Sequence, residues 1–255
     1  MDLELRDRRA LVFGSSSGLG RAVAAALVRE GARVAVVSRS LDRARVALDE
    51  IGADVALRAD LTVDGDGATA VGAAASAFGG LDICVINTGG GQPGPILSTD
   101  GADDAAYRSM LRPVLEVSRA AAPYVTADRA GRLVYLTSRS VVEASPDLAL
   151  SSVFRSGVHA AARSLAIELA PRATVNVVVT GQFDTPALGR FEAARAAATG
   201  STPEHVRDEH IEAIPMGRLG TAAEFADVVT FLCSARAGYV TGTALRIDGG
   251  AIRGF

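Results

Sequence analysis

The chain has 255 residues, of which 49% are hydrophobic and 22% charged, so it can bury one large core, and no linker marks a second domain. A net charge of −3 without blocks of like charge argues against nucleic acid as a partner and favours a small-molecule substrate. No apolar run approaches the roughly 18 residues of a membrane span. The N-terminus has no apolar export signal, so we expect a cytoplasmic protein without membrane contact.

The cysteine and lysine content limits which kinds of site the chain can contain. The two cysteines, Cys84 and Cys233, each lie inside an apolar segment, so we predict buried, unreactive thiols, no disulfide framework and no metal site. All 26 basic residues are arginine, a bias typical of GC-rich coding sequences. An arginine at a position where lysine is usual therefore carries less information in this chain than in most.

Short runs rich in Val, Ile and Leu alternate with Ala-rich stretches of helical periodicity along the whole chain. This order predicts an α/β fold of the Rossmann type: a doubly wound, parallel, seven-stranded sheet with helices on both faces, in a single domain over residues 1–255. Strands are expected near residues 9–13, 33–38, 54–59, 82–87, 132–138, 174–180 and 244–248. Helices are expected near residues 18–30, 41–51, 64–78, 102–127, 150–170 and 221–234, with one or two short ones in an insertion over 185–215.

A glycine-rich loop joins the first strand to the first helix. Its sequence, GSSSGLG over residues 14–20, follows the strand directly and opens the helix. The glycines allow a tight turn and the close approach of a dinucleotide pyrophosphate to the helix N-terminus, whereas the alternative is a turn that binds no ligand. The expected cofactor-binding residues of this loop are Gly14, Ser16, Ser17, Gly18, Leu19 and Gly20.

The end of the second strand distinguishes the two nicotinamide cofactors. An acidic residue there would bind the ribose 2′-hydroxyl of NAD, whereas a basic residue would bind the 2′-phosphate of NADP. The chain has Ser38 and Arg39 at this point and no carboxylate. Because arginine can bind a phosphate through two hydrogen bonds, we expect NADP(H) to be favoured over NAD(H); the alternative is an ordinary surface arginine.

Further motifs lie at the ends of the later strands. They are Asp60-Leu61, Asn87-Thr88-Gly89-Gly90, Thr137-Ser138, the stretch from Gly181 to Thr185, and Ile247-Asp248-Gly249-Gly250. Together with the glycine loop, they resemble the motifs of the short-chain dehydrogenase/reductase family over essentially the whole chain. The branch similar to 3-oxoacyl-carrier-protein reductases shows the resemblance most clearly.

The resemblance implies contacts to the adenine, to the dinucleotide cleft and to the nicotinamide carboxamide. It also implies a mobile substrate lid over residues 185–215 and a homotetramer or homodimer that associates through the helices near 102–127 and 150–170. The positions that it assigns to the cofactor, beyond the glycine loop, are Asp60, Leu61, Asn87, Thr88, Gly89, Gly181, Phe183 and Thr185.

The catalytic positions depart from the family pattern. The family uses a serine, a tyrosine about 13 residues later and a lysine four residues beyond; counted from Ser138, these last two positions hold Ser151 and Arg155. The position of the relay asparagine holds Met110. None of the four tyrosines lies between the serine strand and the lid, so a shifted alignment does not restore the acid.

Loss of the tyrosine matters because carbonyl reduction needs a proton donor. A phenol with a pKa near ~10 serves well beside a lysine, whereas the aliphatic hydroxyl of Ser151 is a far weaker acid. Arg155 can hold the nicotinamide ribose and add positive charge, but its guanidinium stays protonated and relays no proton. Glu143, Asp147 and His159 are candidate replacements; two solvated carboxylates and a helix-packing histidine are the alternatives.

Three functions follow from these observations. The first is an NADP-dependent oxidoreductase in which Ser138 and Arg155 polarise a carbonyl or conjugated alkene, with water or the substrate as the proton source. The second is a redox-neutral dehydratase, isomerase or cyclase with Glu143 as the acid or base. The third is a non-catalytic nucleotide-binding subunit that assembles with an active homologue. The coherent set of nucleotide motifs favours the oxidoreductase.

Overall fold

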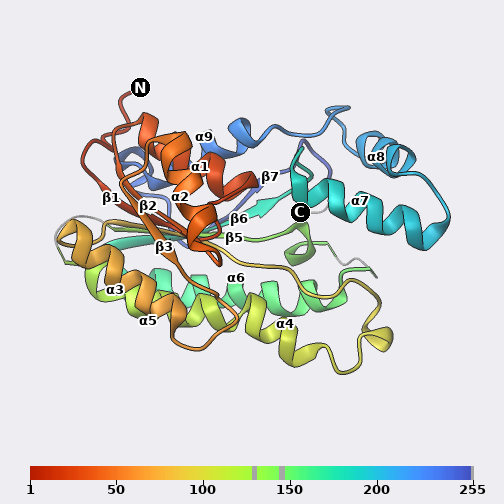
Figure 1. Ribbon diagram of the computed structural model, residues 1–255, viewed down its shortest axis with the longest axis horizontal. Helices are drawn as coiled ribbons and strands as arrows, with labels where there is room; N and C mark the ends of the chain where they lie inside the picture. Colours follow the sequence, from red (N-terminus) through yellow and green to blue (C-terminus); the bar gives the residue numbers. More distant parts are fainter. Residues whose placement is uncertain (128–130, 144–146, 254–255) are drawn as a thin grey trace.

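The computed structural model describes residues 1–127, 131–143 and 147–253. Its centre is a seven-stranded sheet in the order β3-β2-β1-β4-β5-β6-β7, and every neighbouring pair is parallel (Figure 1). The strands are β1 (Arg9–Val12), β2 (Arg33–Ser38), β3 (Val55–Arg58), β4 (Ile83–Asn87), β5 (Gly131–Leu136), β6 (Ala173–Thr180) and β7 (Ala244–Ile247). The predicted Rossmann-type sheet is therefore confirmed.

Helices cover both faces of the sheet (Figure 1). One layer consists of α1 (Gly18–Arg29), α2 (Leu41–Ile51) and α9 (Ala222–Cys233), and the other of α3 (Asp66–Phe78), α5 (Arg112–Val125) and α6 (Ala149–Leu169). Strand side chains alternate between the two resulting cores: Ala10 and Val12 face the first layer and Leu11 the second. Because both faces are buried, the strands are apolar at nearly every position.

The predicted helix over residues 102–127 is wrong as a single element. The structure contains α4 (Asp103–Met110) and α5, separated at Leu111. Pro113 explains the break, because it has no N–H to donate and its ring conflicts with the carbonyl of Ser109 in a continuous helix. The break places the end of α4 beside the loop that follows β4, near the candidate site.

The insertion forms two helices, α7 (Pro186–Thr199) and α8 (Pro203–Glu212), which confirms the expectation of helical structure there. Each begins with a threonine cap followed by proline: Thr185 accepts a hydrogen bond from the N–H of Leu188, and Thr202 from that of His205. The pair lies beyond the carboxyl edge of the sheet (Figure 1). In the described part of the chain, no helix has the length and apolarity required to cross a membrane.

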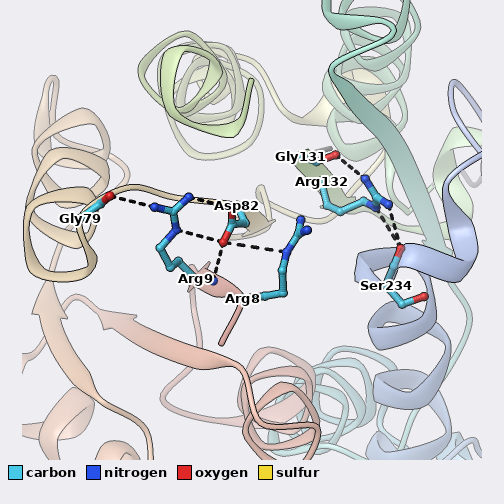
Figure 2. A network of polar contacts seen from close by, with 7 residues as sticks. All are labelled: Arg8, Arg9, Gly79, Asp82, Gly131, Arg132 and Ser234. Atoms are coloured by element: carbon cyan, nitrogen blue, oxygen red, sulfur yellow. Dashed lines mark hydrogen bonds and ion pairs between the residues drawn. The ribbon is translucent and has the colours of Figure 1, made fainter. Parts of the chain in front are cut away.

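At the amino edge of the sheet, a buried carboxylate holds two strands together. Both oxygens of Asp82 accept from the guanidinium of Arg9, at 3.0 and 2.8 Å, and the backbone N–H of Arg9 adds a third bond (Figure 2). Burial alone would raise the pKa of Asp82, yet the hydrogen bonds from Arg9 and the nearby charge of Arg8 hold the pKa below its ordinary value. This edge is therefore a closed polar network.

Arg132 extends the network toward α9. It is buried and donates two hydrogen bonds to the carbonyl of Ser234, which follows α9 directly (Figure 2). Cys233 and Cys84 are also fully buried, and burial raises the pKa of Cys233 to about 12 and raises that of Cys84 as well. The expected burial of both thiols is confirmed, and neither thiol is a nucleophile at neutral pH.

Candidate functional site

A cavity of about 830 Å³ opens at the carboxyl edge of the sheet, between the glycine loop, the ends of β2 and β4, and helices α4 and α7. This is the edge at which doubly wound sheets bind their ligands. The cavity brings together ten of the residues that the sequence assigns to the cofactor. They are Gly14, Ser16, Ser17, Ser38, Arg39, Asp60, Leu61, Asn87, Thr88 and Gly89.

The glycine loop has the shape that a closely bound pyrophosphate requires. Gly14 and Gly18 have φ angles of +63° and +58°, a region that favours glycine. A Cβ atom on Gly20 would lie 2.4 Å from the carbonyl oxygen of Gly14, so the loop has no room for a side chain there. Asn87 donates from its amide to the same carbonyl at 3.4 Å and ties β4 to the loop. Leu19, between these glycines, belongs to the first turn of α1.

Two arginines lie where the second strand ends. Arg39 follows β2, and Arg43 lies in the first turn of α2, capped by Ser40; both line the cavity. Sequence reasoning missed Arg43, although its place four residues after Arg39 was a signal. Neither arginine forms an ion pair with a residue that the structure describes. The end of β2 is therefore a cationic wall of the cavity.

The acidic residue on the other wall is already engaged. Asp60 accepts hydrogen bonds from the backbone and the hydroxyl of Thr62, at 3.0 and 2.7 Å, which lower the pKa of its carboxyl group. Arg39 and Arg58 lower it further by their charges. Asp60 is thus ionised at neutral pH, while the side of the cavity formed by β2 has no carboxylate.

The residues expected at the nicotinamide end are not among those that line the main cavity. The side chain of Phe183 is buried against Phe225, with the ring centroids 5.1 Å apart, and the residue lines a separate, smaller cavity. Gly181 packs against the backbone of Asp248, where a Cβ would have no room. Thr185 caps α7, and its Cβ lies 4.0 Å from the position of a Cβ on Gly18. The start of α7 therefore lies close to the glycine loop.

Arg155 is a buried cation at the catalytic position. Its Nη atoms donate to the carbonyls of Leu136 and Gly89, at 3.3 and 3.0 Å, while its Nε atom has no partner among the described residues. Burial lowers the pKa of Arg155 to about 10, so the guanidinium stays charged at neutral pH. No described carboxylate forms an ion pair with it. A positive charge is therefore fixed between the ends of β4 and β5.

Three serines surround the position where the family has its tyrosine. The hydroxyls of Ser151 and Ser140 lie 2.9 Å apart, and the N–H of Ser140 donates to the hydroxyl of Ser138 at 3.4 Å. Sequence reasoning missed Ser140, which is buried in the short 3₁₀ helix η2 (Arg139–Val141). Because it is engaged with the hydroxyl of Ser140, the hydroxyl of Ser151 is not free to approach a cofactor.

Met110 is part of a dry cluster. Its side chain is fully buried with Ala106 and Leu150, and Phe154 packs against the three. The position that the family resemblance assigns to a relay asparagine thus lies in an apolar environment, which disfavours a buried polar group without a partner.

The candidate replacement acids stay apart from the serine cluster. Glu143 and Asp147 are exposed, and neither forms a described hydrogen bond with Ser138, Ser151 or Arg155. His159 is partly buried on α6, and burial followed by the charge of Arg163 lowers its pKa.

Tyr135, the tyrosine of β5, belongs to the core. Its ring is fully buried, its hydroxyl lies 2.8 Å from that of Ser118, and burial raises its pKa. Within the described chain, the geometry therefore singles out no replacement for the missing phenol.

This sheet, its glycine loop and the cavity at its carboxyl edge define a dinucleotide-binding α/β protein. The family model described as Enoyl-(Acyl carrier protein) reductase matches residues 14–251. The chain therefore belongs to the short-chain dehydrogenase/reductase family and resembles its 3-oxoacyl-carrier-protein reductase branch, as the motifs indicated.

The chain is similar to several proteins of nearly the same length. Nodulation protein G of Rhizobium sp. (strain N33) is 31% identical over 250 residues, covering 97% of this chain and 98% of that protein. A 3-oxoacyl-[acyl-carrier-protein] reductase of Aquifex aeolicus is 29% identical over 257 residues, covering 98% and 99%. L-Sorbose reductase of Gluconobacter frateurii, solved with NADPH and L-sorbose, superposes with a TM-score of 0.92 at 26% identity, with all of both chains covered. The chain is thus an oxidoreductase-family protein.

Proposed function

We propose that the protein is an atypical NADP(H)-dependent oxidoreductase that reduces a carbonyl group or a conjugated alkene of a small molecule. The observation that carries the proposal is the pair Arg39 and Arg43 at the end of β2, which line the cavity and form no ion pair with a described residue. Two arginines in this position complement a 2′-phosphate, which NADP has and NAD lacks. The L-sorbose reductase, solved with NADPH, supports the same cofactor.

The residues that line the cavity are compatible with a dinucleotide. The glycine loop has no side chain that would keep a pyrophosphate away, the arginines would meet a 2′-phosphate, and Phe183 and Thr185 are proposed for the nicotinamide end. When bound, NADPH would supply a hydride to a carbon atom of the substrate. The remaining requirements, charge stabilisation and a proton, fall to the protein.

Ser138 and Arg155 provide the charge stabilisation. The hydroxyl of Ser138 can donate to the substrate oxygen, and the buried guanidinium of Arg155 adds a positive potential as negative charge develops there. Ser151 and Ser140, held together at 2.9 Å, are too weakly acidic to replace a phenol but can orient a water molecule. The proton therefore comes from water or from the substrate itself, and an enolate, which needs no immediate proton, suits this site.

The test begins with titration of the purified protein with NADPH and NADH by calorimetry. Stopped-flow oxidation of NADPH against ketones, quinones and enones follows, with Ser138→Ala as the variant and Ser156→Ala, an exposed serine on α6, as the control. The proposal requires tighter binding of NADPH than of NADH. It also requires a turnover that Ser138→Ala lowers about 100-fold and Ser156→Ala leaves unchanged.

Other outcomes lead to the two remaining functions. Binding of NADPH without oxidation by any acceptor would refute a reductase and favour redox-neutral chemistry on the same fold. Activity that arises only after mixing with a related active subunit would identify a non-catalytic partner.

We also propose a cytoplasmic homodimer or homotetramer that associates through α5 and α6. Val153 and Ile167, on α6, expose 55% and 81% of their surface, an arrangement typical of a covered face. Sedimentation equilibrium measures the oligomeric state, and a Val153→Glu/Ile167→Glu variant should shift it toward the monomer.

A further inference from the structure

The arginines of the lid, residues 185–215, differ in whether they form an ion pair. Arg195 on α7 pairs with Glu209 at 3.2 Å, and Arg207 on α8 pairs with Asp184 at 2.8 Å. Arg190, also on α7, forms no ion pair with any residue that the structure describes. Instead it lines the large cavity, together with the arginines of β2 and α2. Its charge is thus available to a ligand in that cavity.

The start of α7 indicates which part of a ligand Arg190 meets. Thr185, the cap of α7, lies against Gly18, where a Cβ would be 4.0 Å from its own. Gly18 opens α1, whose N-terminus is the expected place of the pyrophosphate. Arg190 follows the cap by five residues, about 7.5 Å along the helix axis. Arg190 is therefore the cavity-lining cation on the helix whose first residues lie near the glycine loop.

We propose that Arg190 is a pyrophosphate-binding residue that the lid contributes to the cofactor site, an inference that rests on the proposed dinucleotide function. The charges support it: Arg39, Arg43 and Arg190 line the cavity together with a single carboxylate, that of Asp60. The first two arginines lie where a 2′-phosphate would be bound. The third would provide a counter-charge for the pyrophosphate, since the glycine loop has no charged side chain of its own.

A network of buried and exposed charges joins α8 to α7. Glu192 of α7 is buried and lies 3.3 Å from the ring of His210, and Arg207 reaches both Glu192, at 3.5 Å, and Asp184. Asp184 directly precedes the cap residue Thr185. Because these contacts tie the two helices together, a ligand that holds Arg190 would hold α8 as well. Cofactor binding would then order the lid before the substrate reacts.

The test compares Arg190→Gln with Arg195→Gln, which removes the same charge from the same helix outside the cavity. Dissociation constants for NADPH and NADH are measured by calorimetry. Arg190→Gln should weaken both cofactors by a similar factor of about ten, because the pyrophosphate is common to them and a charge-assisted hydrogen bond has that strength. Arg195→Gln should leave both constants unchanged.

Hydrogen exchange provides a second readout, independent of turnover. Saturating NADPH should protect residues 186–212 in the unsubstituted protein and in Arg195→Gln, but much less in Arg190→Gln. Equal affinity of Arg190→Gln and the unsubstituted protein would overturn the inference and leave the proposed function intact. A loss confined to NADPH would overturn the assignment to the pyrophosphate. Failure of the unsubstituted protein to bind either cofactor would overturn both proposals.

Discussion

The charged residues at the two edges of the sheet differ in whether they form ion pairs. At the amino edge, Asp82 accepts from Arg9 through both oxygens and is almost fully buried (Figure 2). At the carboxyl edge, Arg39, Arg43 and Arg190 line one cavity and form no ion pair with a described residue. The same residue type thus completes a structural network on one side and faces an open cavity on the other. Position relative to a cavity, more than residue type, separates structural from functional arginines here.

The carboxyl edge itself divides into two parts. The nucleotide part keeps the glycine loop, the link from Asn87 to Gly14 and the cationic wall. At the positions that the family resemblance assigns to the tyrosine and the asparagine, the structure has a serine pair and a methionine cluster. Under the proposed function, binding of the dinucleotide would therefore be separable from delivery of a proton. A site of this kind favours a reaction in which a developing negative charge persists until water protonates it.

Among the substitutions that test this comparison between the two edges of the sheet, the largest loss of stability is expected for Asp82. Asp82→Asn removes the buried negative charge that pairs with the partly buried guanidinium of Arg9, so we expect a loss of about 3 kcal/mol in the free energy of unfolding. Nucleotide affinity should not change, because the network lies at the opposite edge from the cavity. Urea denaturation and calorimetric titration measure the two quantities. Asp227→Asn, at an exposed ion pair on α9, is the control and should cost less than about 0.5 kcal/mol.

The contribution of Asp82 to stability should depend on pH and should decrease as the pH falls. The pKa of Asp82 is lower in the folded protein than its ordinary value, so the unfolded chain binds the proton more readily. The stability that Asp82 contributes is therefore present above its unfolded pKa and is lost as the pH falls through its folded pKa. Asp82→Asn should lack this part of the acid destabilisation. An unchanged acid limb in the variant would contradict the interpretation of the network.

An intermediate loss of stability is expected for Met110→Asn. Met110→Asn places an amide among Ala106, Leu150 and Phe154, where the described structure provides no partner, so we expect about 2 kcal/mol of destabilisation. Met110→Leu, which keeps the volume and the apolar character, should cost less than about 1.5 kcal/mol. Thermal and urea unfolding of both variants measure the difference. If Met110→Asn is as stable as Met110→Leu, the cluster is hydrated and a proton relay through α4 is open after all.

The sequence alone predicts the sheet and many of the residues that line the cavity at its carboxyl edge, because their signals are local. Each strand is a short apolar run, and the glycine loop has its turn, its helix start and its phosphate position within seven consecutive residues. The break before α5 also had a local signal, Pro113, which the helical periodicity of its neighbours concealed.

The remaining parts of the site depend on contacts between distant segments. Ser140 meets Ser151 only because η2 folds back on α6, and Arg190 reaches the cavity only because α7 lies against the glycine loop. The dry environment of Met110 likewise results from the approach of α4 to α6. No spacing along the chain encodes these approaches, so residue types alone do not reveal them.

The smallest of the three effects, and the one that bears most directly on the cofactor, is expected at Arg39. Arg39→Gln removes one cation from the wall formed by β2 and α2, so NADPH should bind about tenfold more weakly while NADH binds as before. Stability should not fall, because Arg39 has no ion pair to lose among the described residues. Calorimetric titration with both cofactors and urea unfolding measure these outcomes.

Arg45→Gln is the matched control for this prediction. Arg45 also belongs to α2, exposes 64% of its side chain and pairs with Asp42, and it does not line the cavity. Its removal changes the net charge equally, so any effect on NADPH shared by both variants reports the general field of the protein rather than a 2′-phosphate contact. A weakening of NADPH and NADH by the same factor in Arg39→Gln alone would place Arg39 at the adenosine or the pyrophosphate. The cationic wall would then bind both cofactors, and the preference for NADP(H) would have to come from Arg43.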